Sequence, residues 1–203
     1  MSRPDNYKTQ TRQAQKLFLN YDQQHLIRKF SLEADDRYLY ANMLCQLYRI
    51  DRTNGEFEKK VDDTWVDANT HAEELTLLDL LCDSRDDRFL TGQWRALAAF
   101  GMQFHQNLTE NGTDPDALRY DREPERLHRA CQALGGEDFP GADIGYAVEL
   151  LDGLRVGIKF WHSDEDFPAQ LRFFWDENAL QYIRYETMYY ALGLLRRRLR
   201  EME

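Results

Sequence analysis

Four segments of the chain repeat apolar residues at intervals of three and four, the spacing that places them on one face of a helix. Such a face needs a partner surface, because a short helix alone is marginal in water. A fifth segment, Trp94–Leu108, has the same spacing around Gly101 and is also predicted to be helical. The four predicted stripes are Ala14, Leu17, Phe18 and Tyr21, continued by His25, Leu26 and Phe30; Leu75, Leu78, Leu81 and Cys82; Leu127, Ala130, Cys131 and Leu134; and Tyr185, Met188, Tyr189, Leu192, Leu195 and Leu199.

Other segments have the composition or the two-residue period of strands. The dipeptides Asn54-Gly55 and Asp152-Gly153 each lie between two such runs. They favour type I′ turns, which need positive φ at both central residues. We therefore predict two antiparallel hairpin meanders, with strands over Arg37–Tyr40, Gln46–Ile50, a segment ending near Val61, Tyr146–Leu151, Leu154–Trp161 and Leu171–Trp175.

Three helix ends are marked in the sequence. Thr70 and Glu73 form the pattern of a capping box, in which a hydroxyl and a carboxylate bond to backbone N–H groups. Pro124 is well placed as the first residue of a helix, where its missing N–H costs nothing. Gly135-Gly136 provides the end of that helix.

The order of elements predicts an α+β fold, with an antiparallel sheet built from the two hairpin meanders and amphipathic helices packed on it. The chain lacks the Gly-rich turn of a doubly wound nucleotide-binding fold. We expect residues 1–203 to form a single α+β domain. Residues 109–123, which include Asn111-Gly112 and Asp114-Pro115, are predicted to be a long surface loop, in which a helical turn at Pro115–Tyr120 is left open.

Composition excludes several classes of protein. Aromatic residues make up 13% of the chain, too many for a disordered protein. The formal net charge is −10, so we expect no nucleic acid and no anionic membrane surface as a partner, because both are bound through Lys and Arg. No apolar run approaches the roughly 18 residues of a spanning helix. The first ten residues lack the apolar core of a signal peptide, and three cysteines without a C-x-x-C motif favour the reducing cytoplasm.

The most polar loop between predicted strands is His162–Pro168. Asp164 and Asp166, with His162 beside them, could hold a divalent cation through oxygen ligands or provide a carboxyl group for acid–base catalysis. The alternative is structural, because a hairpin loop favours short polar residues and Pro. The spacing of an EF-hand is absent, so we expect a structural loop and keep the three residues as candidates for a site.

Asp176 follows the last predicted strand, where a capping role is expected. The alternative is an enzyme in which Asp164, Asp166 and Asp176 surround one cleft, with His162 and Glu186 nearby. A divalent metal or a carboxyl group of raised pKa would then drive hydrolysis or proton transfer. This hydrolase-type alternative predicts that the acidic side chains lie close together around that cleft.

The remaining nucleophiles and metal ligands form no recognisable motif. No histidine pair has the spacing of a zinc-binding helix, and His25, on an apolar stripe, is expected to be buried. Cys82 and Cys131 lie on apolar helix faces and are expected to be small buried hydrophobes. We therefore expect no catalytic residue, no metal ion and no cofactor.

The chain resembles an uncharacterised bacterial family with a domain of unknown function that is common in anaerobes. The resemblance extends over nearly the whole chain, from Tyr7 to Leu199, and it implies no activity and no site residue. It rests on Tyr38-Leu39-Tyr40, Tyr48–Arg52 with Gly55, Asp79-Leu80-Leu81-Cys82, Gly92 with Trp94, Arg129-Ala130-Cys131 with Leu134-Gly135-Gly136, Phe160-Trp161, Asp166-Phe167-Pro168, Leu171, Phe174–Ala179, Tyr182 and Tyr185-Glu186.

We therefore expect a cytoplasmic, non-catalytic domain that binds a small molecule or a protein partner. The acidic-cluster hydrolase is the alternative. The terminal helix is apolar over a wide arc and needs a second partner surface, which the N-terminal helix or a second subunit could provide. We expect a monomer rather than a homodimer, because chain ends often dock side by side.

Overall fold

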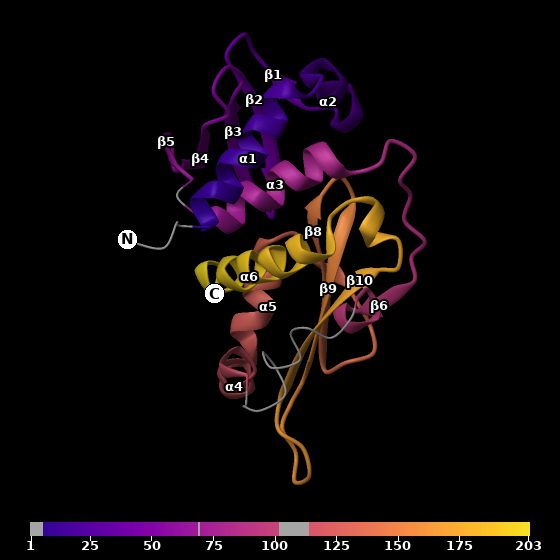
Figure 1. Ribbon diagram of the computed structural model, residues 1–203. Coiled ribbons are helices and arrows are strands. Elements are labelled where there is room, and N and C mark those ends of the chain that lie inside the picture. Colours follow the sequence, from indigo (N-terminus) through magenta and orange to yellow (C-terminus); the bar gives the residue numbers. More distant parts are fainter. Residues whose placement is uncertain (1–5, 69, 102–113) are drawn as a thin grey trace, which may run out of the picture. The chain divides into compact units, whose positions relative to one another are not determined.

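Figure 1 shows a computed structural model of the chain, which describes residues 6–68, 70–101 and 114–203. The chain folds into two compact units. The first unit combines the chain up to Phe89 with Leu180–Leu194, and the second combines Leu90–Ala179 with Leu195–Glu203. Helix α6 (Tyr185–Glu201) therefore contributes residues to both units.

The first unit is built on an antiparallel sheet whose five described strands follow one another in sequence order. Leu39 pairs with Ile50 and Ala41 pairs with Tyr48, and all four side chains are buried on one face of the sheet. The first predicted meander is confirmed, with an additional strand at each end. The strands are β1 (Glu33–Ala34), β2 (Tyr38–Met43), β3 (Gln46–Asp51), β4 (Phe57–Val61) and β5 (Thr64–Asp67).

The turn between β2 and β3 consists of Leu44 and Cys45, whose φ angles are 51° and 53°. A type I′ turn has positive φ at both positions and usually takes Asn or Gly, because a Cβ crowds the backbone there. Leu44 is buried, which offsets part of this strain, whereas Cys45 is exposed. No dipeptide in the sequence marks this turn.

Replacing Cys45 with Gly should raise the free energy of unfolding by about 0.5–1 kcal/mol. Glycine adopts a positive φ without steric cost, and this gain exceeds the entropy that glycine adds to the unfolded chain. Urea denaturation of the wild type, Cys45→Gly and the control Cys45→Ser measures the effect. The control retains a Cβ, so a glycine variant no more stable than the serine variant would show that the turn is unstrained.

The prediction of a type I′ turn at Asn54-Gly55 is wrong. Of these two residues, only Gly55 has a positive φ, 74°. The Asp51 carboxylate accepts hydrogen bonds from the Thr53 backbone N–H at 2.9 Å and from the Thr53 hydroxyl at 2.6 Å, and so organises a longer loop. These bonds hold the pKa of Asp51 at about 2. The local competition of an aspartate for backbone N–H groups therefore decides the loop geometry.

The predicted N-terminal helix is divided into α1 (Asn6–Asn20) and α2 (Gln23–Phe30). Asp22 interrupts it, because its carboxylate accepts the N–H of His25 and caps α2. The expectation of a buried His25 is wrong. Its side chain is 38% exposed, and its Nε2 lies 3.0 Å from the carboxylate of Asp86, which holds the imidazole at the surface.

Helix α3 (His71–Asp83) is buried around most of its circumference. It starts at the predicted position, but the predicted capping bonds are wrong. The Thr70 hydroxyl does not cap the helix and donates instead to Glu73 at 2.5 Å. Glu73, 1% exposed, also accepts hydrogen bonds from Tyr48 and Lys59, both at 3.0 Å. Three donors thus satisfy a buried carboxylate.

The second unit contains a separate antiparallel sheet, with the described strands in the order β6-β10-β9-β8-β7. The α+β class is confirmed, and the two meanders form two sheets instead of one. Asp152 and Gly153, with φ angles of 56° and 76°, form the predicted type I′ turn between β8 and β9. The strands are β6 (Trp94–Ala96), β7 (Glu137–Asp138), β8 (Ile144–Leu151), β9 (Leu154–Trp161) and β10 (Gln170–Asp176).

The sequence prediction fails in the segment before α4. Trp94 begins a strand that pairs with β10, and Leu97–Ala99 form a short 3-10 helix, so the helix predicted over Trp94–Leu108 is wrong up to residue 101. The strand depends on a partner about 80 residues away, which local periodicity does not report. The rest of that helix, and residues 109–113 of the predicted loop, lie outside the described residues. Pro115–Arg122 form helix α4, longer than the helical turn left open there.

Helices α4, α5 (Pro124–Ala133) and the last turns of α6 pack in the second unit. Pro124 is the first residue of α5, as predicted. Tyr120 of α4 makes an edge contact with Phe160, and the Arg196 guanidinium of α6 lies 4.8 Å from the ring centroid of Phe173. Both aromatic rings belong to the face of β9 and β10 that also buries Trp175.

Ion pairs fasten α4 to the end of α6. Arg196 bonds to Asp114 and to Asp116, in each case at 2.7 Å, and Arg200 bonds to Asp116 at 3.0 Å. Burial raises the pKa of Asp114, but the hydrogen bond and the charge of Arg196 outweigh it and hold that pKa below its ordinary value. The basic end predicted for the terminal helix therefore serves packing within the second unit as well as the helix dipole.

Candidate functional site

The candidate site lies where the hairpin of β9 and β10 turns. Trp161, the last residue of β9, pairs with Gln170, the first residue of β10. Side chains two residues apart on a strand point to the same face, so Arg172 follows Gln170 on the face that carries Trp161. The Arg172 guanidinium lies 5.8 Å from the ring centroid of Trp161.

The acidic loop between these strands closes on itself. The Asp164 carboxylate accepts the backbone N–H groups of Asp166 at 2.9 Å and Phe167 at 2.7 Å, and the Asp164 N–H donates to the carbonyl of Phe167. Residues 162–168 are all exposed. One oxygen of Asp164 thus builds the turn that holds Phe167 and Pro168 in place, which is the structural role expected of this loop.

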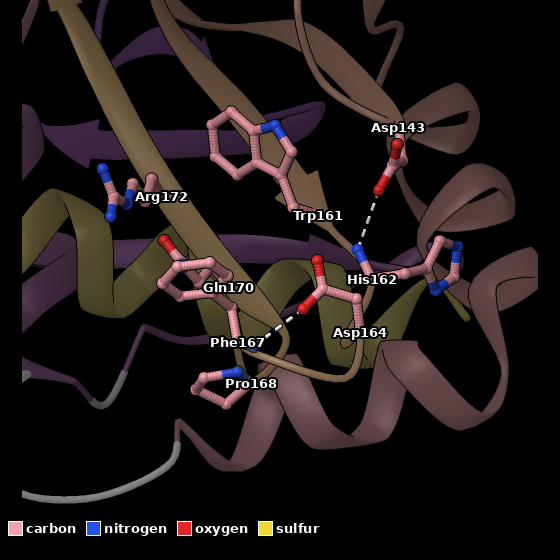
Figure 2. A pocket seen from close by; sticks show the side chains of 8 residues that line it. All are labelled: Asp143, Trp161, His162, Asp164, Phe167, Pro168, Gln170 and Arg172. Carbon is pink, nitrogen blue, oxygen red and sulfur yellow. Dashed lines mark hydrogen bonds between the residues drawn. The ribbon is translucent and has the colours of Figure 1, made fainter.

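His162 and Ser163 attach the loop to α4. The Asp121 carboxylate accepts the hydroxyl of Ser163 at 2.6 Å and lies 3.0 Å from Nδ1 of His162. The bonds from Ser163 and His162 hold the pKa of Asp121 below its ordinary value. The backbone N–H of His162 donates to Asp143 at 2.8 Å. Figure 2 shows the imidazole turned away from the other side chains, so His162 contributes its backbone to the site.

A surface cavity of about 390 Å³ occupies this place. Figure 2 shows that Arg172 lies on one side of it and that Asp143 and Asp164 lie on the other. Aromatic side chains stand between them, and Phe167 is 62% exposed. The cavity is lined by Asp143, Trp161, His162, Asp164, Phe167, Pro168, Gln170 and Arg172.

An aromatic cluster continues along the same sheet face. Phe139 contacts the rings of Trp94 and Phe174, with centroids 4.6 and 6.1 Å apart, and lies against the backbone of Gly145 and Gly157. A Cβ at Gly145 would lie 1.9 Å from the Phe139 carbonyl oxygen, and one at Gly157 would lie 2.5 Å from its ring. The two glycines let Phe139 cover the sheet face beyond the cavity.

The other acidic candidates lie elsewhere. Asp176 is 4% exposed and accepts backbone N–H groups from Thr91 at 3.0 Å, Gly92 at 2.7 Å and Asn178 at 2.8 Å. It therefore joins two loops and does not cap α6, which begins at Tyr185.

Asp176 ends β10, whereas the acidic loop precedes it, so about 20 Å of strand separates them. The two do not surround one cleft, as the enzyme alternative requires, because the loop connects β9 to β10 and Asp176 lies at the opposite end of that hairpin. Glu186 is exposed on α6 in the first unit, and Asp166 is exposed in its loop. Of the five candidates, only His162 and Asp164 line the cavity.

Sequence reasoning found the loop and missed most of the cavity. Trp161, Gln170 and Arg172 follow from the strand register, which a correct pairing of the two predicted strands would have provided. Asp143 and Asp121 carry no local signal, because they meet the loop only through the fold. No group of three or more His, Cys, Asp or Glu side chains arranged to hold a metal ion occurs within residues 6–68, 70–101 and 114–203.

Comparisons with known proteins assign a family. A family model described as a domain of unknown function, DUF3786, matches residues 22–198, most of the chain. No curated protein and no solved structure matches. In the described part of the chain, every helix is too short or too polar to cross a membrane. The match confirms the resemblance to a domain family of unknown function, and the chain belongs to the DUF3786 family.

Proposed function

We propose that the protein is a non-catalytic binding domain and that its ligand is a small molecule held in the cavity at the turn of β9 and β10. The observation that carries this proposal is the Arg172 side chain. It is exposed at the cavity, and no described carboxylate pairs with it. An unpaired guanidinium beside the half-buried ring of Trp161 and the exposed ring of Phe167 is a typical recognition surface.

The size and the lining of the cavity support a small ligand. A volume of about 390 Å³ falls in the range of small-molecule sites, roughly 300–1,000 Å³. Trp161 and Phe167 offer apolar ring surface, and Gln170 offers an amide that makes no hydrogen bond to another described residue. A few polar groups around an apolar centre are what such sites use to fix orientation.

The positions of the carboxylates favour binding over catalysis. The acidic-cluster hydrolase needs Asp164 and Asp176 at one reacting centre, and the length of β10 separates them. Asp176 is engaged by three backbone N–H groups, and Asp164 by two. These bonds support roles in loop structure for both residues.

The cysteines support a cytoplasmic location for this binding domain. Cys45, Cys82 and Cys131 are all free thiols, and Cys45 is exposed. Burial raises the pKa of Cys82 and of Cys131 to about 12, which makes both unreactive. An exposed thiol persists in the reducing environment of the cytoplasm.

Binding of a panel of indole, benzoate, benzylamine and L-phenylalanine tests the proposal. At least one member should bind to the wild type, and Trp161→Ala should weaken it about tenfold, because ring stacking contributes about 0.5–1.5 kcal/mol beyond the buried area. Isothermal titration calorimetry measures both. Trp65→Ala is the matched control, since the Arg49 guanidinium lies 4.5 Å from the ring centroid of Trp65 in the first unit.

Two results would contradict the proposal. One is that no member of the panel binds to the wild type at a ligand concentration of about 10 mM, which would detect even a dissociation constant in the millimolar range. The other is that Trp161→Ala and Trp65→Ala have the same effect, which would place the bound molecule elsewhere.

A further inference from the structure

We propose that the ligand is a zwitterion of the α-amino acid class, with its carboxylate on Arg172 and its ammonium group near Asp143 and Asp164. This inference rests on the proposed function and deepens it. The cavity has a cationic side and an anionic side, with aromatic surface between them (Figure 2). That juxtaposition selects a molecule with both charges and an apolar body.

The cationic side consists of Arg172 and Gln170. A guanidinium presents N–H donors in a planar fork that matches the two oxygens of a carboxylate. Arg172 contacts the Trp161 ring but has no carboxylate partner among the described residues, so its donors are available. Gln170 precedes it on the same face and adds an amide donor beside the same position.

The anionic side consists of one oxygen from each of two carboxylates. Oδ2 of Asp143 accepts the N–H of His162, and Oδ1 of Asp164 accepts two N–H groups from its own loop. The second oxygens, Oδ1 of Asp143 and Oδ2 of Asp164, accept no hydrogen bond from a described residue. The imidazole of His162 is bound to Asp121, so it does not neutralise this side.

The charge pattern excludes ligands with a single charge. A simple anion would pair with Arg172 but would also meet Asp143 and Asp164, and repulsion between like charges would cancel the gain. A simple cation would be attracted by the two carboxylates and repelled by Arg172. A zwitterion pairs with both sides at once, and its side chain can cover Trp161 and Phe167.

Titration of L-phenylalanine against its blocked forms tests the inference. N-acetyl-L-phenylalanine lacks the ammonium group, and L-phenylalaninamide lacks the carboxylate. Each should bind about tenfold or more weakly than L-phenylalanine, because each loses a charge-assisted contact. Calorimetry measures the three dissociation constants.

Two conservative variants assign the ends of the ligand. Arg172→Gln should weaken binding of L-phenylalanine about tenfold. It should not weaken binding of L-phenylalaninamide, which has no carboxylate to lose and is no longer repelled by the guanidinium. Asp143→Asn should weaken binding of L-phenylalanine but not of N-acetyl-L-phenylalanine, which has no ammonium group to lose and meets one negative charge fewer. Because an asparagine oxygen still accepts the His162 N–H, this variant retains the loop contact.

The possible failures are distinguishable. If L-phenylalanine binds no more tightly than both blocked forms, or if Arg172→Gln weakens all three equally, the zwitterion is wrong and the cavity remains a binding site. If neither the amino acid nor any other member of the aromatic panel binds, the proposed function fails, and this inference fails with it.

Discussion

The free energy of unfolding should fall by about 1–2 kcal/mol as the pH rises from 4.5 to 7.5, and Glu74→Gln should remove part of that loss. Burial and the charge of Glu73 raise the pKa of Glu74 from 4.5 to about 7, although a hydrogen bond from Thr11 opposes them. Burial likewise raises the pKa of Asp79 from 3.8 to about 6, against the hydrogen bond of Thr187. Both groups lie on α3.

The sign follows from proton binding. A carboxyl whose folded pKa lies above its unfolded pKa holds more protons in the folded state, so folding is favoured below that interval. Stability is then lost as the pH rises through the interval, about 4.5 to 7 for Glu74. The side chain is partly exposed, so the effect is smaller than the roughly 3 kcal/mol that the full shift implies.

Urea denaturation at several pH values compares the wild type with two variants. Glu74→Gln should match the wild type near pH 4.5 and exceed its stability at pH 7.5. Glu73→Gln is the control on the same helix. It replaces a carboxylate that accepts hydrogen bonds from Tyr48, Lys59 and Thr70 with a neutral amide. The weaker hydrogen bonds should lower the free energy of unfolding at both pH values. If the stability difference between Glu74→Gln and the wild type is the same at both pH values, Glu74 does not titrate in this interval.

Gly145→Ala should destabilise the protein by about 3 kcal/mol or more, whereas Gly193→Ala should stabilise it by about 0.5–1 kcal/mol. The new Cβ at Gly145 would lie 1.9 Å from the carbonyl oxygen of Phe139, so the backbone must shift. Gly193 is an exposed glycine inside α6 with open space around it, and alanine favours a helix there. Thermal and urea unfolding measure both changes.

A double substitution separates the two close contacts around Phe139. At Gly157 the obstacle is the ring of Phe139, so Phe139→Ala should relieve part of the cost of Gly157→Ala. At Gly145 the obstacle is backbone, and Phe139→Ala should give no relief. A Gly145→Ala protein as stable as the wild type would mean that the loop bearing Phe139 does not pack closely on β8.

Local signals predict the elements that depend on local chemistry. The turn at Asp152-Gly153 and the start of α5 at Pro124 were found because φ preferences and a missing N–H act within a few residues. The turn at Leu44-Cys45 was missed, because burial of Leu44 overrides the preference for Asn or Gly. The strand at Trp94 was missed because its partner, β10, is distant in the sequence.

The candidate site likewise has a part that local sequence predicts and a part that depends on the fold. The acidic loop was recognised from its composition, and its structural role follows from short-range bonds such as those accepted by Asp164. The cavity depends on cross-strand register, which places Arg172 beside Trp161, and on the contact of Asp143 with the loop. Neither relation leaves a pattern in a single sequence, because each joins residues from different elements.

Nuclear magnetic resonance of the indole N–H groups tests the central claim, that the cavity between β9 and β10 binds a small zwitterion. The chain has four tryptophans, and Trp161→Phe assigns the resonance of Trp161 by its loss. Titration with L-phenylalanine should shift that resonance in a saturable manner and leave the resonances of Trp65 and buried Trp175 in place. Saturable shifts confined to other tryptophans, or none at about 10 mM ligand, would contradict the claim.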